Sequence, residues 1–224
     1  GGDSPPGAKL SASEEFTGAG QPVGAWASGG SMNTARRMLG SAGTRDSALG
    51  FGGVNPSATQ AVTESYNGTN WTEVNDLNTA RRDLRGCGAT NTASLAMTGD
   101  GGTQLCETWN GTNWTEVNDT NTGRKYAGSG GTNTSALIFG GNTPPNNIVD
   151  TELWNGTNWT EVNNLNTGRH NMAGSGADNT ACLCIGGESP TTGKTETWNG
   201  TNWTEVNDLN TARRSLAGAG TNTA

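Results

Sequence analysis

The sequence has little of what catalytic sites usually need. It contains one histidine, His170, and two tyrosines, Tyr66 and Tyr126, in 224 residues. Other copies of the same segment carry arginine or lysine in place of the histidine, so we expect a solvated cation there rather than a base. A competent site needs a nucleophile, a base and an orienting group together, and no Ser-His-Asp set can be assembled. We therefore predict a protein that is not an enzyme and that needs no cofactor.

Positive charge and long apolar runs are also scarce. The chain has 13 Lys and Arg against 20 Asp and Glu, a net charge of -7. It lacks the basic face that displaces phosphate counterions, which argues against a nucleic-acid partner. No apolar run approaches the roughly 20 residues of a membrane span, and no signal peptide is visible in the sequence as given. We expect no membrane insertion.

Cysteine is sparse and metal-ligand spacings are lacking. Four cysteines occur, at positions 87, 106, 182 and 184, without a zinc-ligand pattern. Cys182 and Cys184 would share one face of a strand and cannot easily bridge each other. We expect free, buried thiols. Asn-Asp pairs recur after the outer strands without EF-hand spacing, so they are interpreted as loop caps, with weak calcium binding left open. No metal site is predicted.

The chain is rich in glycine, and its tryptophans are regularly spaced. Thirty-six glycines and 30% hydrophobic residues would suggest disorder, but only 15% of residues are charged and the eight tryptophans recur regularly. One tryptophan series has spacings of 43 to 45 residues: Trp26, Trp71, Trp114, Trp159 and Trp203. This period is typical of propeller blades or helical pairs. No segment shows a 3.6-residue period, which leaves a propeller.

The repeated unit is clearest at 196–214, and it recurs from Glu152, Glu107 and Glu64 with an eroded copy from Glu14. Each unit predicts four strands, exemplified by residues 152–154, 158–162, 169–176 and 181–187. Asn155-Gly156 predicts a two-residue hairpin turn with positive φ at both positions. Four strands a repeat, with length variation in the loop after Gly-Gly, describe a propeller blade.

The unit resembles the kelch repeat. It has an apolar strand ending in Gly-Gly, then Glu-x-aromatic, a tryptophan about five residues later, and Leu and Arg in the following loop. The resemblance implies that the diglycine strand lies towards the inside of the blade and that the paired aromatics are core between blades. Gly101-Gly102 follow a polar segment, so the second blade is expected to have an irregular inner strand. The recurring sequence Asn-Gly-Thr-Asn-Trp is also similar to repeats of tail-fibre-like proteins of marine bacteriophages.

We therefore predict an all-β fold, a β-propeller of five four-stranded kelch-like blades in one domain over 1–224. The repeat units are approximately 1–53, 54–102, 103–141, 142–187 and 188–224. The two termini would close the ring within one blade. An excerpt from a larger propeller is the alternative.

The candidate site is a set of cations at the turn into the third strand. Its members are Arg36, Arg81, Arg124, Arg169 and Arg213. A ring of guanidinium groups could hold an anionic glycan or carboxylate. The favoured alternative is that each arginine pairs with a recurring glutamate of its own or the next blade, namely Glu73, Glu116, Glu161 or Glu205.

The leading functional hypothesis is a structural or adhesive module on a virion, as a phage fibre or decoration, or on another exterior surface. Its partners would be proteins or host-surface glycans, and homo-oligomers within a larger assembly are compatible with the repeats. The main alternative is a lectin-like propeller that binds glycans at repeated sites. An intracellular kelch-type adaptor is a third.

Overall fold

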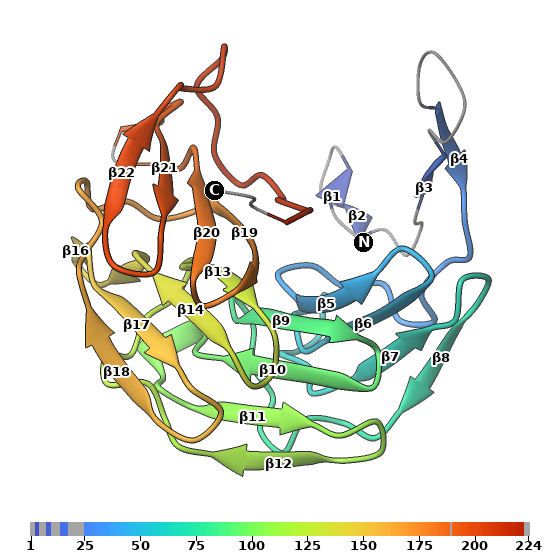
Figure 1. The fold of residues 1–224 in the computed structure, drawn as a ribbon. Coiled ribbons are helices and arrows are strands. Elements are labelled where there is room, and N and C mark those ends of the chain that lie inside the picture. Colours follow the sequence, from blue (N-terminus) through green and yellow to red (C-terminus); the bar gives the residue numbers. More distant parts are fainter. Residues whose placement is uncertain (1–2, 5–7, 10–13, 18–24, 189, 222–224) are drawn as a thin grey trace.

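The structure is a computed structural model that describes residues 3–4, 8–9, 14–17, 25–188 and 190–221. Four antiparallel four-stranded sheets surround a central channel (Figure 1), so the chain is an all-β propeller, as predicted. In the described part, no helix has the length and apolar character needed to cross a membrane.

Each complete blade runs from an inner to an outer strand in chain order. The strands of the four blades are β5 (Gly40–Thr44), β6 (Ser47–Phe51), β7 (Thr63–Tyr66) and β8 (Trp71–Val74); β9 (Arg85–Thr90), β10 (Ala93–Met97), β11 (Cys106–Trp109) and β12 (Trp114–Val117); β13 (Gly128–Gly131), β14 (Ala136–Phe139), β17 (Thr151–Trp154) and β18 (Trp159–Val162); and β19 (Ala173–Asp178), β20 (Ala181–Ile185), β21 (Thr195–Trp198) and β22 (Trp203–Val206). The two-stranded sheets pair β1 (Asp3–Ser4) with β2 (Ala8–Lys9), β3 (Glu14–Thr17) with β4 (Ala25–Ser28), and β15 (Asn142–Thr143) with β16 (Asn146–Asn147).

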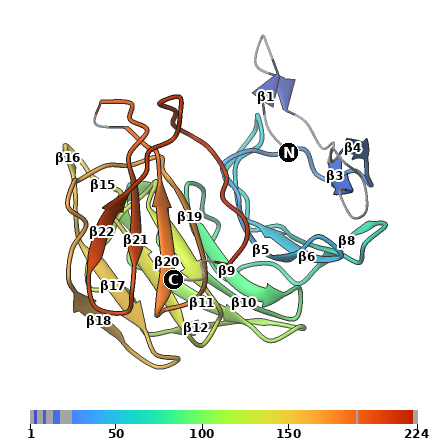
Figure 2. The same ribbon diagram turned by 45° about the horizontal axis from the view of Figure 1, so that its top comes forward.

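The described residues form four complete blades rather than the expected five. A blade starts after the arginine-bearing turn and ends with the outer hairpin of the next repeat. No strand follows β22 among the described residues, so the two ends of the chain hold only parts of a fifth blade. Its outer hairpin is β3–β4, which stands apart in Figure 2. At the other end, Ser175 Oγ of β19 donates a hydrogen bond to Gly220 O. The predicted ring closure falls on residues 1–2 and 222–224, outside the described residues.

The innermost strands are β5, β9, β13 and β19, which lie next to one another around the channel. The diglycine strand is the second of each sheet, next to the innermost strand, so it lies towards the inside of the blade as expected. The predicted strand 169–176 begins only at Ala173, because Asn171 (φ 55°) turns the chain before it. Glycine is required at Gly40, where a Cβ would overlap the ring of Phe51 on the paired strand.

The outer hairpins form as predicted, with a different turn. Trp154 pairs with Trp159, which leaves four residues in the loop. Asn155 Oδ1 accepts the backbone N–H groups of Thr157 (3.0 Å) and Asn158 (2.9 Å), an Asx turn. Gly156 has φ 91° whereas Asn155 is not in the left-handed region, so the predicted two-residue turn is wrong.

The second strand of the second blade is apolar and its irregularity is confined to a register shift against β9 between Ala93 and Leu95, a smaller departure than expected. Residues 94–97 of β10 are buried and pair fully with β11. The strand ends before Thr98, and Asp100–Gly102 forms a separate 3-10 turn. The polar residues that suggested an irregular strand therefore belong to the following loop.

The hydrophobic core lies in layers between neighbouring blades, as the resemblance implied. The paired tryptophans are buried, and their second members pack against the preceding blade. Trp203 meets Phe139 edge to face at 4.7 Å, and its indole N–H donates to Thr151 Oγ1 at 3.0 Å. Trp114 meets Phe51 in the same way at 4.9 Å. Each tryptophan pair therefore joins two blades.

Candidate functional site

The five predicted site arginines lie in loops that lead from one blade into the next. The exposed fraction is 0% for Arg36, Arg124 and Arg169 and 3% for Arg81, whereas Arg213 is exposed. The walls of the channel cavities are made by other residues. The structure therefore does not bring these five side chains together as a ring open to a ligand.

Arg124 shows how a buried arginine is used. Its NH2 forms an ion pair with Glu152, and its NH1 donates to Asp150 O at 2.7 Å. The Glu152 carboxylate also accepts the backbone N–H groups of Asn121 (2.6 Å) and Thr122 (3.1 Å). Charge and backbone hydrogen bonds thus fix the incoming loop to the third strand of the blade it enters. Burial lowers the pKa of the Arg124 guanidinium, and Glu152 opposes that shift.

The same ion pair recurs in the other blades, with partners that differ from those expected. The pairs are Arg36–Glu64 (2.7 Å), Arg81–Glu107 (2.7 Å) and Arg169–Glu196 (2.8 Å). The glutamates named from the sequence, Glu73, Glu116, Glu161 and Glu205, are exposed on the outer strands. The loop runs along the third strand and contacts the outer strand through an asparagine amide, as from Asn33 to Trp71 O at 3.1 Å, whereas its arginine pairs on the third strand. The prediction that each arginine pairs with a recurring glutamate is therefore confirmed for these buried arginines, but the glutamates named from the sequence were the wrong ones.

The recurring Asn-Asp loops cap backbone, as interpreted from the sequence. The second residue of each pair accepts the N–H that opens the third strand, through Asp76 to Thr63, Asp119 to Cys106, Asn164 to Thr151 and Asp208 to Thr195, at 3.1–3.2 Å. An amide oxygen replaces a carboxylate at Asn164, so the role is hydrogen bonding. Within the described residues, no group of three or more His, Cys, Asp or Glu side chains is placed to hold a metal ion.

The second residue after each arginine position differs in every repeat. We call these the rim residues; they are Met38, Asp83, Tyr126, Asn171 and Ser215. All have φ between 54° and 58°, a conformation rare outside glycine. Backbone hydrogen bonds join several of them across the blades, such as Asp83 N to Met38 O at 2.9 Å and Ser215 N to Asn171 O at 2.8 Å. Backbone strain of this kind is concentrated at functional sites.

A chain of polar contacts runs along the rim. Asp83 and Tyr126 share a side-chain hydrogen bond, and the Tyr126 ring lies 5.9 Å from that of His170. His170 Nε2 is 3.6 Å from Glu188, which forms an ion pair with Arg214. The His170 side chain is thus 19% exposed and lies beside a carboxylate, less open to solvent than expected.

Burial sets the protonation of two rim groups. It raises the pKa of Asp83, with a further contribution from Asp100. It also raises the pKa of Tyr126, helped by the Asp83 charge. Tyr126 therefore remains a neutral phenol, able to donate a hydrogen bond at neutral pH.

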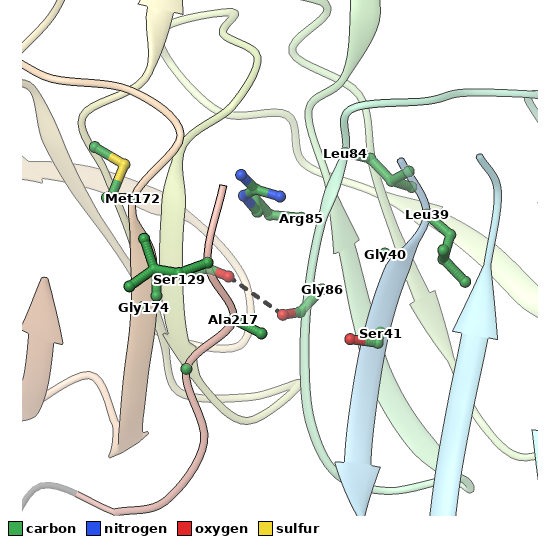
Figure 3. A pocket seen from close by; sticks show the side chains of 13 residues that line it. Leu39, Gly40, Ser41, Leu84, Arg85, Gly86, Ser129, Met172, Gly174 and Ala217 are labelled. Carbon is green, nitrogen blue, oxygen red and sulfur yellow. Dashed lines mark hydrogen bonds between the residues drawn. The ribbon is translucent and has the colours of Figure 1, made fainter. Parts of the chain in front are cut away.

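The rim leads into the channel, where one cavity has a volume of about 260 Å³ and a second, along the inner strands, about 340 Å³. Arg85 of β9 points into the first cavity, between Leu84 and Met172 (Figure 3). Across the cavity Ser129 Oγ donates to Gly86 O at 3.2 Å. The remaining wall is largely glycine backbone. Arg85 is positively charged, whereas the other residues that line this cavity are uncharged.

The four cysteines are free and buried, as predicted. Burial raises the pKa of Cys106, Cys182 and Cys184 to about 12, and raises that of Cys87 as well. The thiolate is the nucleophilic form, so these thiols are unreactive at neutral pH.

Sequence reasoning missed the rim and Arg85. It concentrated on positions that repeat, whereas these positions are recognisable because the repeats differ there. Aligned on the buried arginine, the position of Arg85 holds Gly40, Gly128, Ala173 and Ala217 in the other copies. A search for positions that break the repetition would have identified both.

Comparison with known proteins gives the fold alone. Neither a protein-family model nor a curated protein sequence matches the chain. Among solved structures, one titled "Structure of YjhT" is similar with a TM-score of 0.77 and 9% sequence identity, covering 93% of this chain and 81% of that one. At this identity the likeness concerns architecture, and it agrees with the arrangement of the sheets described above: the chain is a β-propeller.

Proposed function

We propose that this propeller is a non-enzymatic structural and adhesive module of an exterior surface, such as a virion or cell surface, and that it contacts its partner through the rim. One observation carries the proposal. Among near-identical repeats, the second residue after each arginine position differs in every copy, and these five residues, Met38, Asp83, Tyr126, Asn171 and Ser215, share one strained backbone conformation. A surface where five-fold repetition is broken suits a single, asymmetric partner.

The chemistry of the rim supports binding over catalysis. Its charged groups engage one another, as in the Arg82–Asp100 pair at 2.7 Å. Lys125 lies over the Tyr126 ring, with Nζ 5.2 Å from the centroid. Met38 is 38% exposed and offers an apolar contact. Such mixtures of aromatic, cationic and apolar side chains are typical of contact surfaces.

A second candidate function rests on the outer edge of the ring. At three joints between blades, an exposed asparagine amide bridges to the next hairpin: Asn75 to Asn113, Asn118 to Asn158 and Asn163 to Asn202, at 2.8–2.9 Å. Repeated exposed amides could hydrogen-bond sugar hydroxyls. They favour the lectin-like alternative, with one glycan site at each joint.

The test compares two sets of variants in one binding assay. Fluorescently labelled protein is applied to a glycan array and to panels of whole cells. Met38→Asp with Lys125→Glu alters the rim, and Asn118→Ala alters an edge joint. Lys194→Glu is the matched charge control, since Lys194 pairs with exposed Glu205 on the outer strand.

A rim function predicts that the rim variant loses cell-surface binding by about tenfold while the other two retain it, the loss typical of a central contact. A lectin predicts binding to one sugar class that only Asn118→Ala weakens. Equal binding by all four proteins, or no binding by the wild type, would refute the rim proposal.

A further inference from the structure

The channel cavity contains a cation that the rest of the fold does not use. Arg85 Nε donates to Ala127 O. Its two terminal nitrogens make no hydrogen bond or ion pair with the described residues. Asp83 is the carboxylate that acts on it electrostatically, without an ion pair among the described residues. The buried arginines of the loops are different, because each has its own glutamate.

The position of Arg85 is not demanded by the propeller. The other copies have glycine or alanine here, and Gly40 and Gly128 are enforced by the overlying rings of Phe51 and Phe139. The strand paired with Arg85 presents Met97 instead. A flexible thioether leaves room for a long side chain, which the rings of Phe51 and Phe139 do not leave in the first and third blades.

We infer that Arg85 and the surrounding channel mouth form a binding site for a small monocarboxylate. The planar guanidinium has a fork of N–H donors that matches the two oxygens of a carboxylate. The cavity of about 260 Å³ accepts a ligand of a few heavy atoms. This site lies beyond the proposed rim function and does not depend on it.

Charge and lining define the ligand class. One guanidinium, with Asp83 nearby in a protein of net charge -7, suits a single negative charge better than a dianion. Leu39, Leu84, Met172 and Leu216 provide an apolar collar around the cation. A carboxylate with a short aliphatic tail meets both conditions. Such a group comes either from a free acid or from the C-terminus of an inserted peptide.

The expected change in affinity follows from the hydrogen bonds between Arg85 and the carboxylate that a substitution of Arg85 removes. Two hydrogen bonds to a charged group should change affinity by about tenfold or more. Arg85→Ala places in this blade the residue that Ala173 and Ala217 supply elsewhere, so the fold should persist. Arg85→Lys keeps the charge and loses the fork. Lys194→Ala removes one positive charge at the periphery and is the matched control.

The experiment is a ligand-observed NMR titration of the full chain with butyrate, its neutral isostere butyramide, and inorganic phosphate. We expect butyrate to bind the wild type at least about tenfold more tightly than Arg85→Ala, and within about twofold of Lys194→Ala. Arg85→Lys should be intermediate. Butyramide and phosphate should bind more weakly than butyrate. A short apolar peptide, with a free or an amidated C-terminus, distinguishes the two carboxylate sources.

Several outcomes overturn the inference. They are no butyrate binding by the wild type at 50 mM (roughly the weakest affinity worth assigning), equal binding of butyrate and butyramide, unchanged butyrate affinity in Arg85→Ala, or preference for phosphate. If Arg85→Ala does not fold, the wild-type comparison of butyrate with butyramide and the Arg85→Lys titration decide. A rim variant that loses surface binding but keeps butyrate separates this site from the proposed function.

Discussion

Replacing Glu152 by glutamine tests whether the buried ion pairs hold the blades together. Glu152 and Arg124 are both 0% exposed, and the carboxylate accepts the N–H groups of Asn121 and Thr122 in addition to the guanidinium. The amide has the same shape but no charge, and its NH2 group would face a donor. Removing one partner of a buried pair costs about 3–5 kcal/mol, because the other charge stays buried and unpaired.

The assay is urea and thermal unfolding followed by tryptophan fluorescence. For a chain of this size 1 kcal/mol corresponds to about 2–4 °C, so we expect a fall in Tm of about 6–20 °C. Glu161→Gln is the control: Glu161 is exposed and lies directly opposite Glu152 on the paired strand. Its loss should change the free energy of unfolding by less than about 0.5 kcal/mol.

The double variant Arg124→Met with Glu152→Gln separates the pair from its surroundings. It should be more stable than Glu152→Gln alone, because no uncompensated charge remains. The reasoning fails if Glu152→Gln costs less than about 1 kcal/mol, or if it matches Glu161→Gln. Either result would mean that water reaches the pair and that the loops are held by backbone hydrogen bonds alone.

Three further predictions concern single side chains. Trp159→Ala should lower the free energy of unfolding by about 3–5 kcal/mol in urea denaturation, since the indole is only 7% exposed between two blades; a loss below about 1 kcal/mol would contradict its core role. Cys106→Thr should stabilise the protein by about 0.5–1.5 kcal/mol in the same assay, because the buried indole N–H of Trp159 has no hydrogen-bond partner among the described residues whereas the equivalent Trp203 donates to the hydroxyl of Thr151; destabilisation would mean that the site cannot accept a threonine. Asp83→Asn should change the pH dependence of stability. The pKa of Asp83 is raised above 3.8 by folding, so the folded state holds the proton more tightly and the contribution of Asp83 falls as pH rises through that raised value; parallel curves of unfolding free energy for wild type and variant between pH 3 and pH 7 would contradict this.

The rules that fixed the strands act locally, and they were accessible from the sequence. The Asn155-Gly156 hairpin, the apolar strand at 181–185 and the alternation around Trp159 each depend on neighbours within a few residues. Even there, the turn type was wrong. The loop between Trp154 and Trp159 has four residues and is closed by an Asx turn at Asn155.

The partner of each arginine depends on the path of the loop. Arg124 and Glu152 are 28 residues apart, and sequence pattern alone offered Glu161 as readily as Glu152. Only the crossing of the loop over the third strand decides between them. The contacts of the rim also depend on the tertiary structure. Asp83, Tyr126 and His170 meet because successive blades place equivalent turns side by side.

The sequence by itself therefore determined an all-β chain of repeated blades with tryptophans between them, because period, glycine placement and aromatic spacing act over short distances. The tertiary structure decided where each blade begins, which glutamate neutralises which arginine, and which side chains surround the channel. Arg85 illustrates the division. In the sequence it is one arginine among several, and only the ring, by bringing the inner strands together, places it in a cavity with no ion pair to a carboxylate of the described residues.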